Sequence, residues 1–251
     1  MLSYLSQGGD LARFALLVLI LRLPIVCIAL STHESAHGYA ALRAGDPTAK
    51  NFGRISLNPL KHFDLFGTLS MIILGIGWAK PVPINSRYFK KPKRDIALTA
   101  AAGPVSNLLL AIIGMLLLRV FDIIFFDGGY YNAAIGSYTF ADLAPSFIIE
   151  SDLGLADKLK FVWMFFLEMF GTLNLSLAIF NLIPVPPFDG SRIAFAILPD
   201  KYYFGIMRYE RIIMLVFIFL FYQFGSGFSY FVNGIYNGIY GILTLATSFL
   251  V

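Results

Sequence analysis

Long apolar runs separated by short, charged loops make up most of the chain. Residues 24–44, 96–118 and 161–183 are each long enough to cross a bilayer, which takes about 20 mostly apolar residues at roughly 1.5 Å each. Residues 212–251 carry no charged side chain, and the glycine-serine-glycine sequence at 225–227 predicts two more helices joined by a tight turn. The pattern therefore predicts an all-α polytopic membrane protein with five transmembrane helices.

The first of these runs has another apolar stretch in front of it. Pro24 is expected to begin the transmembrane helix, because its missing N–H is not needed in the first turn of a helix. Residues 11–21 then form either an interfacial helix or a kinked extension of the same helix. The first residues show no basic start and no small-residue cleavage site, so we expect no removable signal peptide.

One further apolar segment, residues 65–79, is short and rich in glycine, and it either crosses the membrane as a sixth helix or dips in and returns. The loops on both sides of it contain several Lys and Arg residues, whereas residues 121–156 contain acidic residues and no Lys or Arg. Because Lys and Arg gather in cytoplasmic loops, both basic loops belong on the cytoplasmic side and the acidic loop outside. We therefore predict a re-entrant segment, which is tolerated where it is buried in protein or lines a wet cavity.

Composition supports a membrane protein, since 58% of the residues are hydrophobic, 14% are charged and the mean hydropathy is +0.74. The basic residues behind the net charge of +4 lie in short loops, where they set membrane orientation, so we exclude nucleic acid as a partner. Cys27 is the one cysteine, which excludes an intramolecular disulfide and a thiolate metal cluster. No long soluble block interrupts the apolar runs, and we expect one transmembrane domain over residues 1–251.

Two histidines and a glutamate lie inside the first apolar run, in the sequence HESAH at residues 33–37. Residues four apart on a helix share a face, so His33 and His37 can reach one Zn²⁺ while Glu34 reaches a water molecule on it. Zinc lowers the pKa of that water toward about 7 and polarises a carbonyl, and the glutamate carries the proton, which is the chemistry of amide hydrolysis. The other interpretation, three polar groups held by interhelical hydrogen bonds, is expensive in a membrane without a function.

A catalytic zinc site needs a third protein ligand. His62 and Asp64 are candidates in a basic loop, and Glu168 lies inside an apolar run. Asp189 follows a proline-rich helix end, and the prolines let its carboxylate turn inward at membrane depth, although Asp-Gly is also a common turn signal. The spacing of these residues leaves the choice open.

Three motifs in chain order resemble those of the site-2 protease family of intramembrane zinc metalloproteases: HExxH, AAGPVSN at residues 101–107 and NLIPVPPFDG at residues 181–190. The resemblance covers about residues 24–200, and it is greatest to short prokaryotic members that lack PDZ and CBS domains. It implies a multi-pass protein of a prokaryotic cell membrane that cleaves transmembrane proteins, with its active site toward the cytoplasm.

The resemblance also implies a role for each site residue. His33, His37 and Asp189 are expected to bind Zn²⁺, and Glu34 is expected to be the general acid and base. Asn181 matches a family asparagine that helps to hold the substrate carbonyl or its oxyanion.

Two more polar residues are placed outside the catalytic group. We interpret Asn107, the last residue of the second motif, as a helix-packing residue, with a role in the site as the less favoured alternative. Glu168 is an acidic residue inside a span and therefore a functional candidate by default, but Lys158 and Lys160 lie close to it in the chain, and we leave it out of the site.

Two other functions compete with a protease. A zinc-dependent membrane transporter also carries His, Asp and Glu inside the membrane, but it needs no general base beside the metal. A catalytically inactive membrane scaffold is favoured where Glu34 or Asp189 is replaced, and here both are present.

Overall fold

The structure is a computed structural model that describes residues 9–74, 79–128 and 153–250, and within these ranges every regular element is helical. The longer helices are α2 (Gly9–Ala44), α4 (Leu65–Leu74), α5 (Pro92–Phe126), α8 (Leu155–Asn181), α10 (Asp200–Met207) and α11 (Glu210–Ala246). The short elements are α3 (Thr48–Asn51), α9 (Asp189–Phe195) and the 3-10 turns η1 (Pro59–Lys61), η2 (Ser86–Tyr88) and η4 (Ser248–Leu250). The predicted all-α class is confirmed.

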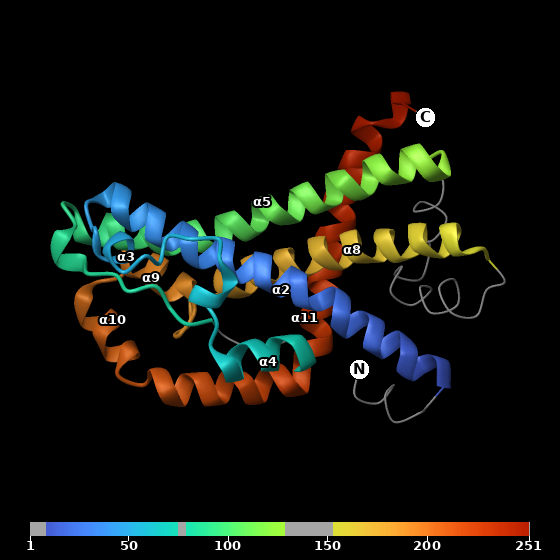
Figure 1. Ribbon diagram of the computed structural model, residues 1–251. Helices are drawn as coiled ribbons and strands as arrows, with labels where there is room; N and C mark the ends of the chain where they lie inside the picture. The colour runs from blue at the N-terminus through green and yellow to red at the C-terminus, as the bar shows by residue number, and fades with distance from the viewer. Residues whose placement is uncertain (1–8, 75–78, 129–152, 251) are drawn as a thin grey trace.

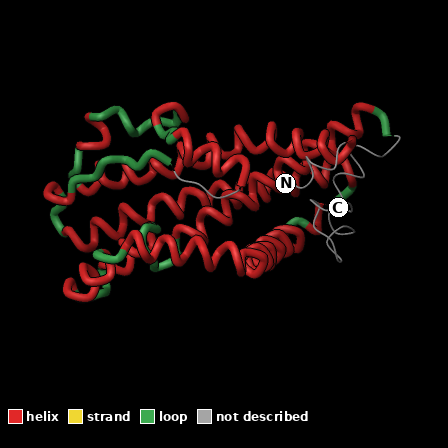
Figure 2. Tube along the Cα trace, turned by 90° about the horizontal axis from the view of Figure 1, so that it is seen from below, coloured by secondary structure: helices red, strands yellow, loops and turns green. Residues whose placement is uncertain are grey.

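Three long helices, α2, α5 and α8, lie side by side and form a bundle (Figure 1, Figure 2). In the described part of the chain these three helices are long and apolar enough to cross a membrane, and a fourth is added if the two parts of α11 form one bent span. This confirms a polytopic α-helical membrane protein, although the described residues provide fewer spans than the five predicted.

The direction of the helices decides which loops meet. Helices α2 and α8 run one way and α5 runs the other, so α3, the start of α5, α9 and α10 lie together at one end of the bundle (Figure 1). Lys50 lies in α3, Lys201 in α10 and Lys91 directly before α5, so these basic residues share that end. Asp142, which we expect on the opposite side, lies outside the described residues.

Helices α5 and α8 approach each other closely in the middle of the bundle. A Cβ atom on Gly114 would lie 3.2 Å from the backbone nitrogen of Gly171, so the two backbones are in contact where neither residue has a side chain. Small residues at helix crossings allow this packing in membrane proteins. Buried side chains of α5, α8 and α11 continue the core on one side of the crossing; they include Met115, Leu118, Met164, Tyr236 and Tyr240.

The prediction that Pro24 begins a helix is wrong. Helix α2 runs without a break from Gly9 to Ala44 with Pro24 inside it, so residues 11–21 are an extension of the same helix. Proline removes one backbone hydrogen bond, but the surroundings of a membrane helix offer no water to compete for the remaining backbone groups. The helix therefore continues on both sides of the proline.

The tight turn expected at Gly225 and Gly227 is also wrong. The chain stays helical from Glu210 to Ala246, and the parts Glu210–Phe221 and Gly225–Ala246 meet at 79°. Neither glycine has a positive φ, the conformation that ends many helices at a glycine, so the helix bends instead of reversing. The second part of α11 crosses α8 and α5 steeply and packs against both (Figure 1).

The short apolar segment before Lys80 leaves the bundle end and returns to it. The backbone N–H of Lys80 donates to the carbonyl oxygen of His62 at 2.8 Å, which places the two ends of the segment side by side. Between them, α4 has ten residues, which is about 15 Å of helix and roughly half of a bilayer core. The structure supports the re-entrant interpretation over a sixth span; residues 75–78 lie outside the described part.

Candidate active site

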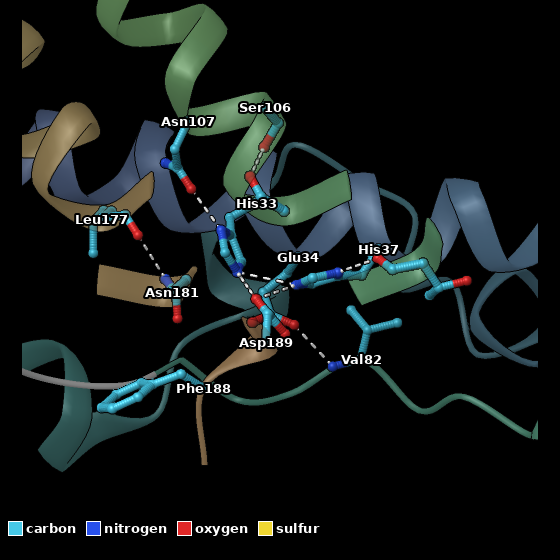
Figure 3. Close-up of polar contacts among 12 residues, drawn as sticks. His33, Glu34, His37, Val82, Ser106, Asn107, Leu177, Asn181, Phe188 and Asp189 are labelled. Atoms are coloured by element: carbon cyan, nitrogen blue, oxygen red, sulfur yellow. Dashed lines mark hydrogen bonds and ion pairs between the residues drawn. The ribbon is translucent and has the colours of Figure 1, made fainter. Parts of the chain in front are cut away.

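The side chains of His33, His37 and Asp189 meet near the basic end of the bundle (Figure 3). His33 and His37 stack one turn apart on α2, with their Nε2 atoms 3.0 Å apart. Asp189 is the first residue of α9, and its Oδ2 lies 3.1 Å from Nε2 of His33 and 3.2 Å from Nε2 of His37. Three potential ligand atoms from two distant parts of the sequence therefore form a nearly equilateral triangle. In the part of the chain that the structure describes, this is the one such cluster of His, Cys, Asp or Glu.

The triangle has the size that a zinc ion requires. Zinc–nitrogen and zinc–oxygen bonds of about 2.0–2.2 Å in a tetrahedral site separate ligand atoms by about 3.3 Å, close to the distances found. Gly103 of α5 faces the same point, because a Cβ atom on it would overlap Nε2 of His37 and lie 2.6 Å from Nε2 of His33. The space beside both nitrogen atoms is thus kept free by a residue without a side chain. The residues present fit a bound zinc ion.

Helix α5 holds both imidazole rings from the other side. Nδ1 of His37 lies 2.7 Å from the carbonyl oxygen of Thr99, which can only accept a hydrogen bond, so Nδ1 carries the proton. Nδ1 of His33 lies 2.5 Å from Oδ1 of Asn107 (Figure 3). With the proton on Nδ1, each ring presents the lone pair of Nε2 toward the centre of the cluster, as metal-binding histidines do.

Glu34 lies beside the cluster and is not part of it. Its Oε2 accepts a hydrogen bond from the backbone N–H of Val82 at 2.9 Å, and both residues are buried. The extended segment that carries Val82 is itself fastened, because Arg54 donates to the carbonyl of Lys80 and Asp46 accepts from the N–H of Asn85. The carboxylate of Glu34 is therefore held by a backbone group while it remains next to the histidines.

The turn between α8 and α9 brings Asp189 back to the bundle. Gly190 makes this possible, because a Cβ atom there would overlap the carbonyl oxygens of Leu182 and Ile183 at the end of α8. Phe188 packs against Phe180 with ring centroids 4.5 Å apart, which fixes the turn from its other side. Gly190 has no positive φ, so this Asp-Gly pair serves a close approach of two helix ends and not a left-handed turn.

The other candidate ligands lie elsewhere. His62 is fully buried and its Nε2 bonds to the carbonyl of Ser56 at 2.7 Å, while Asp64 accepts from the N–H of Gly67 at the start of α4. Both residues stabilise their own loop. Glu168 lies thirteen residues before Asn181 on α8, about 20 Å along the helix. The structure therefore favours Asp189 among the four.

Asn181 is the last residue of α8, and its Nδ2 donates to the carbonyl of Leu177, one turn back on that helix, at 3.0 Å (Figure 3). For Asn107 the structure favours the alternative, a role in the site, over helix packing alone, because its Oδ1 lies 2.5 Å from Nδ1 of His33. Gly103 was missed. The AAGPVSN motif resembled a family motif, and its spacing of four residues between Gly103 and Asn107 was the signal that both face one side of α5.

Comparisons with known proteins agree with this geometry. The model of peptidase family M50 matches residues 22–223, which is most of the chain and includes His33, Glu34, His37, Asn181 and Asp189. The chain belongs to peptidase family M50. This is the family of site-2 proteases, and membership makes the chain a zinc metalloprotease.

Two bacterial relatives of this M50 peptidase are informative. It is 39% identical over 194 residues to "Putative zinc metalloprotease YwhC" of Bacillus subtilis, covering 77% of this chain and 76% of the relative. It is 31% identical over 102 residues to "Putative zinc metalloprotease Rip2" of Mycolicibacterium smegmatis, covering 38% of each chain. No solved structure matches the chain.

Proposed function

We propose that this M50 peptidase is an intramembrane protease that hydrolyses peptide bonds of membrane-embedded substrate helices, with His33, His37 and Asp189 as zinc ligands. The observation that carries the proposal is the convergence of these three side chains inside a bundle of membrane helices. His37 and His33 lie seven and eleven residues before the end of α2, about 10 and 16 Å along the helix. A peptide bond cleaved there lies within the membrane or at its inner boundary.

The roles of the side chains follow from their positions. Zinc, when bound, supplies a Lewis acid that activates water and polarises the scissile carbonyl. The Glu34 carboxylate takes a proton as the water oxygen bonds to the carbonyl carbon. It then gives the proton to the nitrogen as the C–N bond breaks. Val82 holds one oxygen of the carboxylate, so the other oxygen is left for the water.

Asn181 is proposed to donate its amide N–H to the carbonyl oxygen of the substrate as negative charge develops there. Its amide donates within α8 to Leu177, and a rotation of the side chain releases this donor. Figure 3 shows the Asn181 side chain at the end of α8, in the same region as the cluster. This position suits a group that contacts a substrate bound to the cluster.

The orientation in the membrane is part of the proposal. The bundle end that carries the cluster also carries the basic loops, and basic loops stay in the cytoplasm. We therefore place the active site toward the cytoplasmic face of a prokaryotic cell membrane. The whole of residues 1–251 is proposed to form one transmembrane domain.

Cleavage of defined transmembrane peptides tests the function. Purified protein in lipid vesicles is incubated with a panel of such peptides, and the fragments are identified by mass spectrometry. We expect internal cleavage that stops with a zinc chelator, returns with added zinc and is absent in the Glu34→Gln variant. Cleavage that persists with the chelator, or that Glu34→Gln leaves unchanged, would contradict the proposal.

A further inference from the structure

Asn107 is one member of a chain of buried amide groups that ends at a zinc-ligand candidate. Its Oδ1 faces Nδ1 of His33 at 2.5 Å, and its Nδ2 donates to Oδ1 of Asn174 at 2.9 Å. Nδ2 of Asn174 in turn donates to the carbonyl oxygen of Phe170 at 2.9 Å. Both asparagine residues are fully buried, with no exposed area at all. These hydrogen bonds run from α8 through α5 to α2.

The direction of every hydrogen bond in this chain follows from one fixed group. The backbone carbonyl of Phe170 can only accept, so Asn174 must turn its Nδ2 toward it and its Oδ1 toward Asn107. Oδ1 of Asn174 also only accepts, so Asn107 turns its Nδ2 toward α8 and its Oδ1 toward His33. Nδ1 of His33 must then carry a proton, so Nε2 is the nitrogen that can offer its lone pair to a metal ion.

The opposite orientation of Asn107 is incompatible with a metal site. A flipped amide presents its NH₂ group to Nδ1 of His33, so the ring proton moves to Nε2, where it blocks a metal ion. A second bond from Nδ2 of Asn107, to the carbonyl of Ala29, is 3.4 Å long and therefore weak. His37 needs no such chain, because the carbonyl of Thr99 holds its Nδ1 directly.

We propose that Asn174 is a positioning residue that acts through Asn107 to select the metal-binding tautomer of His33. The inference rests on the proposed zinc site for its function, but Asn107 holds the proton on Nδ1 of His33 in the metal-free protein as well. Asn174 bonds to Asn107 and to the carbonyl of Phe170, and neither of these residues is a ligand candidate. Asn174 therefore affects the metal site only by orienting the side-chain amide of Asn107.

The tautomer itself is the first measurement. The protein contains three histidines, so ¹⁵N-histidine labelling gives few signals. The variants His37→Gln and His62→Gln each remove one set of signals, and the set that remains in both belongs to His33. In the metal-free protein we expect His33 to be protonated on Nδ1. Asn174→Ala should populate both tautomers, whereas Asn174→Asp should restore the first one, because a neutral carboxylic acid has the same donor and acceptor as the amide. An unchanged tautomer in Asn174→Ala overturns the inference, whether or not the protein binds zinc.

Zinc affinity gives an independent test through a second position. Asn174→Ala should weaken zinc binding about tenfold, at the lower end of the range for residues behind a metal ligand. An Asp at position 107 presents an oxygen to Nδ1 of His33 whichever way it is turned, so in Asn107→Asp the proton on Nδ1 no longer depends on Asn174. When Asn174→Ala is added to Asn107→Asp, the zinc affinity should change less than about twofold. The reason is that the orientation of the side chain at position 107, which Asn174 controls, no longer matters. An equal loss in both backgrounds means that Asn174 acts by packing and overturns the inference.

Leu175 provides the matched control. It is the next residue on α8, it is equally buried, and it belongs to the apolar core instead of the amide chain. Leu175→Ala removes more buried volume than Asn174→Ala and should lower the thermal stability at least as much. It should leave the His33 tautomer on Nδ1 and the zinc affinity near that of the unchanged protein. A loss of the tautomer in Leu175→Ala would show that any disturbance of α8 has this effect, and would overturn the inference.

Discussion

The backbone N–H of Val82 donates to Oε2 of Glu34 at 2.9 Å, and this bond ties the extended segment after Lys80 to α2. Lys80, whose N–H donates to the carbonyl of His62, lies two residues before Val82. The end of the segment between His62 and Lys80 is therefore held close to the candidate base Glu34. The bond fixes a carboxylate without neutralising it, because the donor is a neutral amide. Glu34 is therefore held beside the triangle of ligand atoms, which is the position that the proposed proton transfer requires.

Replacing Glu34 by Gln should abolish cleavage and leave zinc bound. The amide oxygen of Gln can still accept from Val82, so the local structure is preserved, but the side chain no longer takes a proton. General acid–base catalysis contributes about 10²–10⁴-fold, and a loss of this size is expected. Peptide cleavage and the zinc content of the purified variant are measured together. Loss of zinc in Glu34→Gln would show that Glu34 is a ligand and not the base.

The local pattern predicted part of this site. The spacing of His33 and His37 places them on one face of a helix wherever that helix forms, so their pairing follows from the sequence. Asp189 lies 156 residues from His33, and the residues alone left its choice open among four candidates. Resemblance to a family selected it, and the geometry agrees because the end of α8 and the start of α9 are packed together at Gly190.

The features that were missed depend on contacts between helices. Nothing in the local sequence says that Asn107 faces His33, 74 residues away, or that Gly103 is needed because two imidazole rings lie against it. The bend of α11 was missed for a related reason. Gly225 and Gly227 permit a turn, a bend or a straight helix, and packing of the second part of α11 against α5 and α8 selects the bend.

Adding one methyl group at Gly103 should remove the metal. The Cβ atom of Gly103→Ala overlaps both Nε2 atoms, and the rings can escape only by giving up their bonds to Thr99 and Asn107. We expect zinc content and cleavage to fall together. Met115→Ala is the matched control, because it disturbs the buried apolar core of the same helix, away from the cluster and from the amide chain. It should lower thermal stability and keep the zinc; equal zinc loss in both variants would contradict the role given to Gly103.

We predict that Asp189 is the third zinc ligand. Asp189→Ala removes one corner of the triangle, and we expect both zinc affinity and cleavage to fall sharply. His62→Ala and Asp64→Ala should leave zinc content near that of the unchanged protein, because the structure places both side chains in bonds within their own loop. These two substitutions should instead lower the thermal stability of the protein. The reverse pattern of zinc loss would move the third ligand to the loop before α4.

The last prediction concerns the side of the membrane on which the basic loops lie. Single cysteines at Lys50, Lys91 and Asp142, each in a Cys27→Ser background, are labelled with a membrane-impermeant reagent in intact cells and in inverted vesicles. Lys50 and Lys91 are exposed and flank a segment whose ends are bonded to each other, so both should label from the cytoplasmic side. Asp142 should label from outside, because α5 leads away from Lys91 across the whole bundle. Labelling of Lys50 and Lys91 from opposite sides would require the segment between them to cross the membrane, which the bond between His62 and Lys80 does not allow.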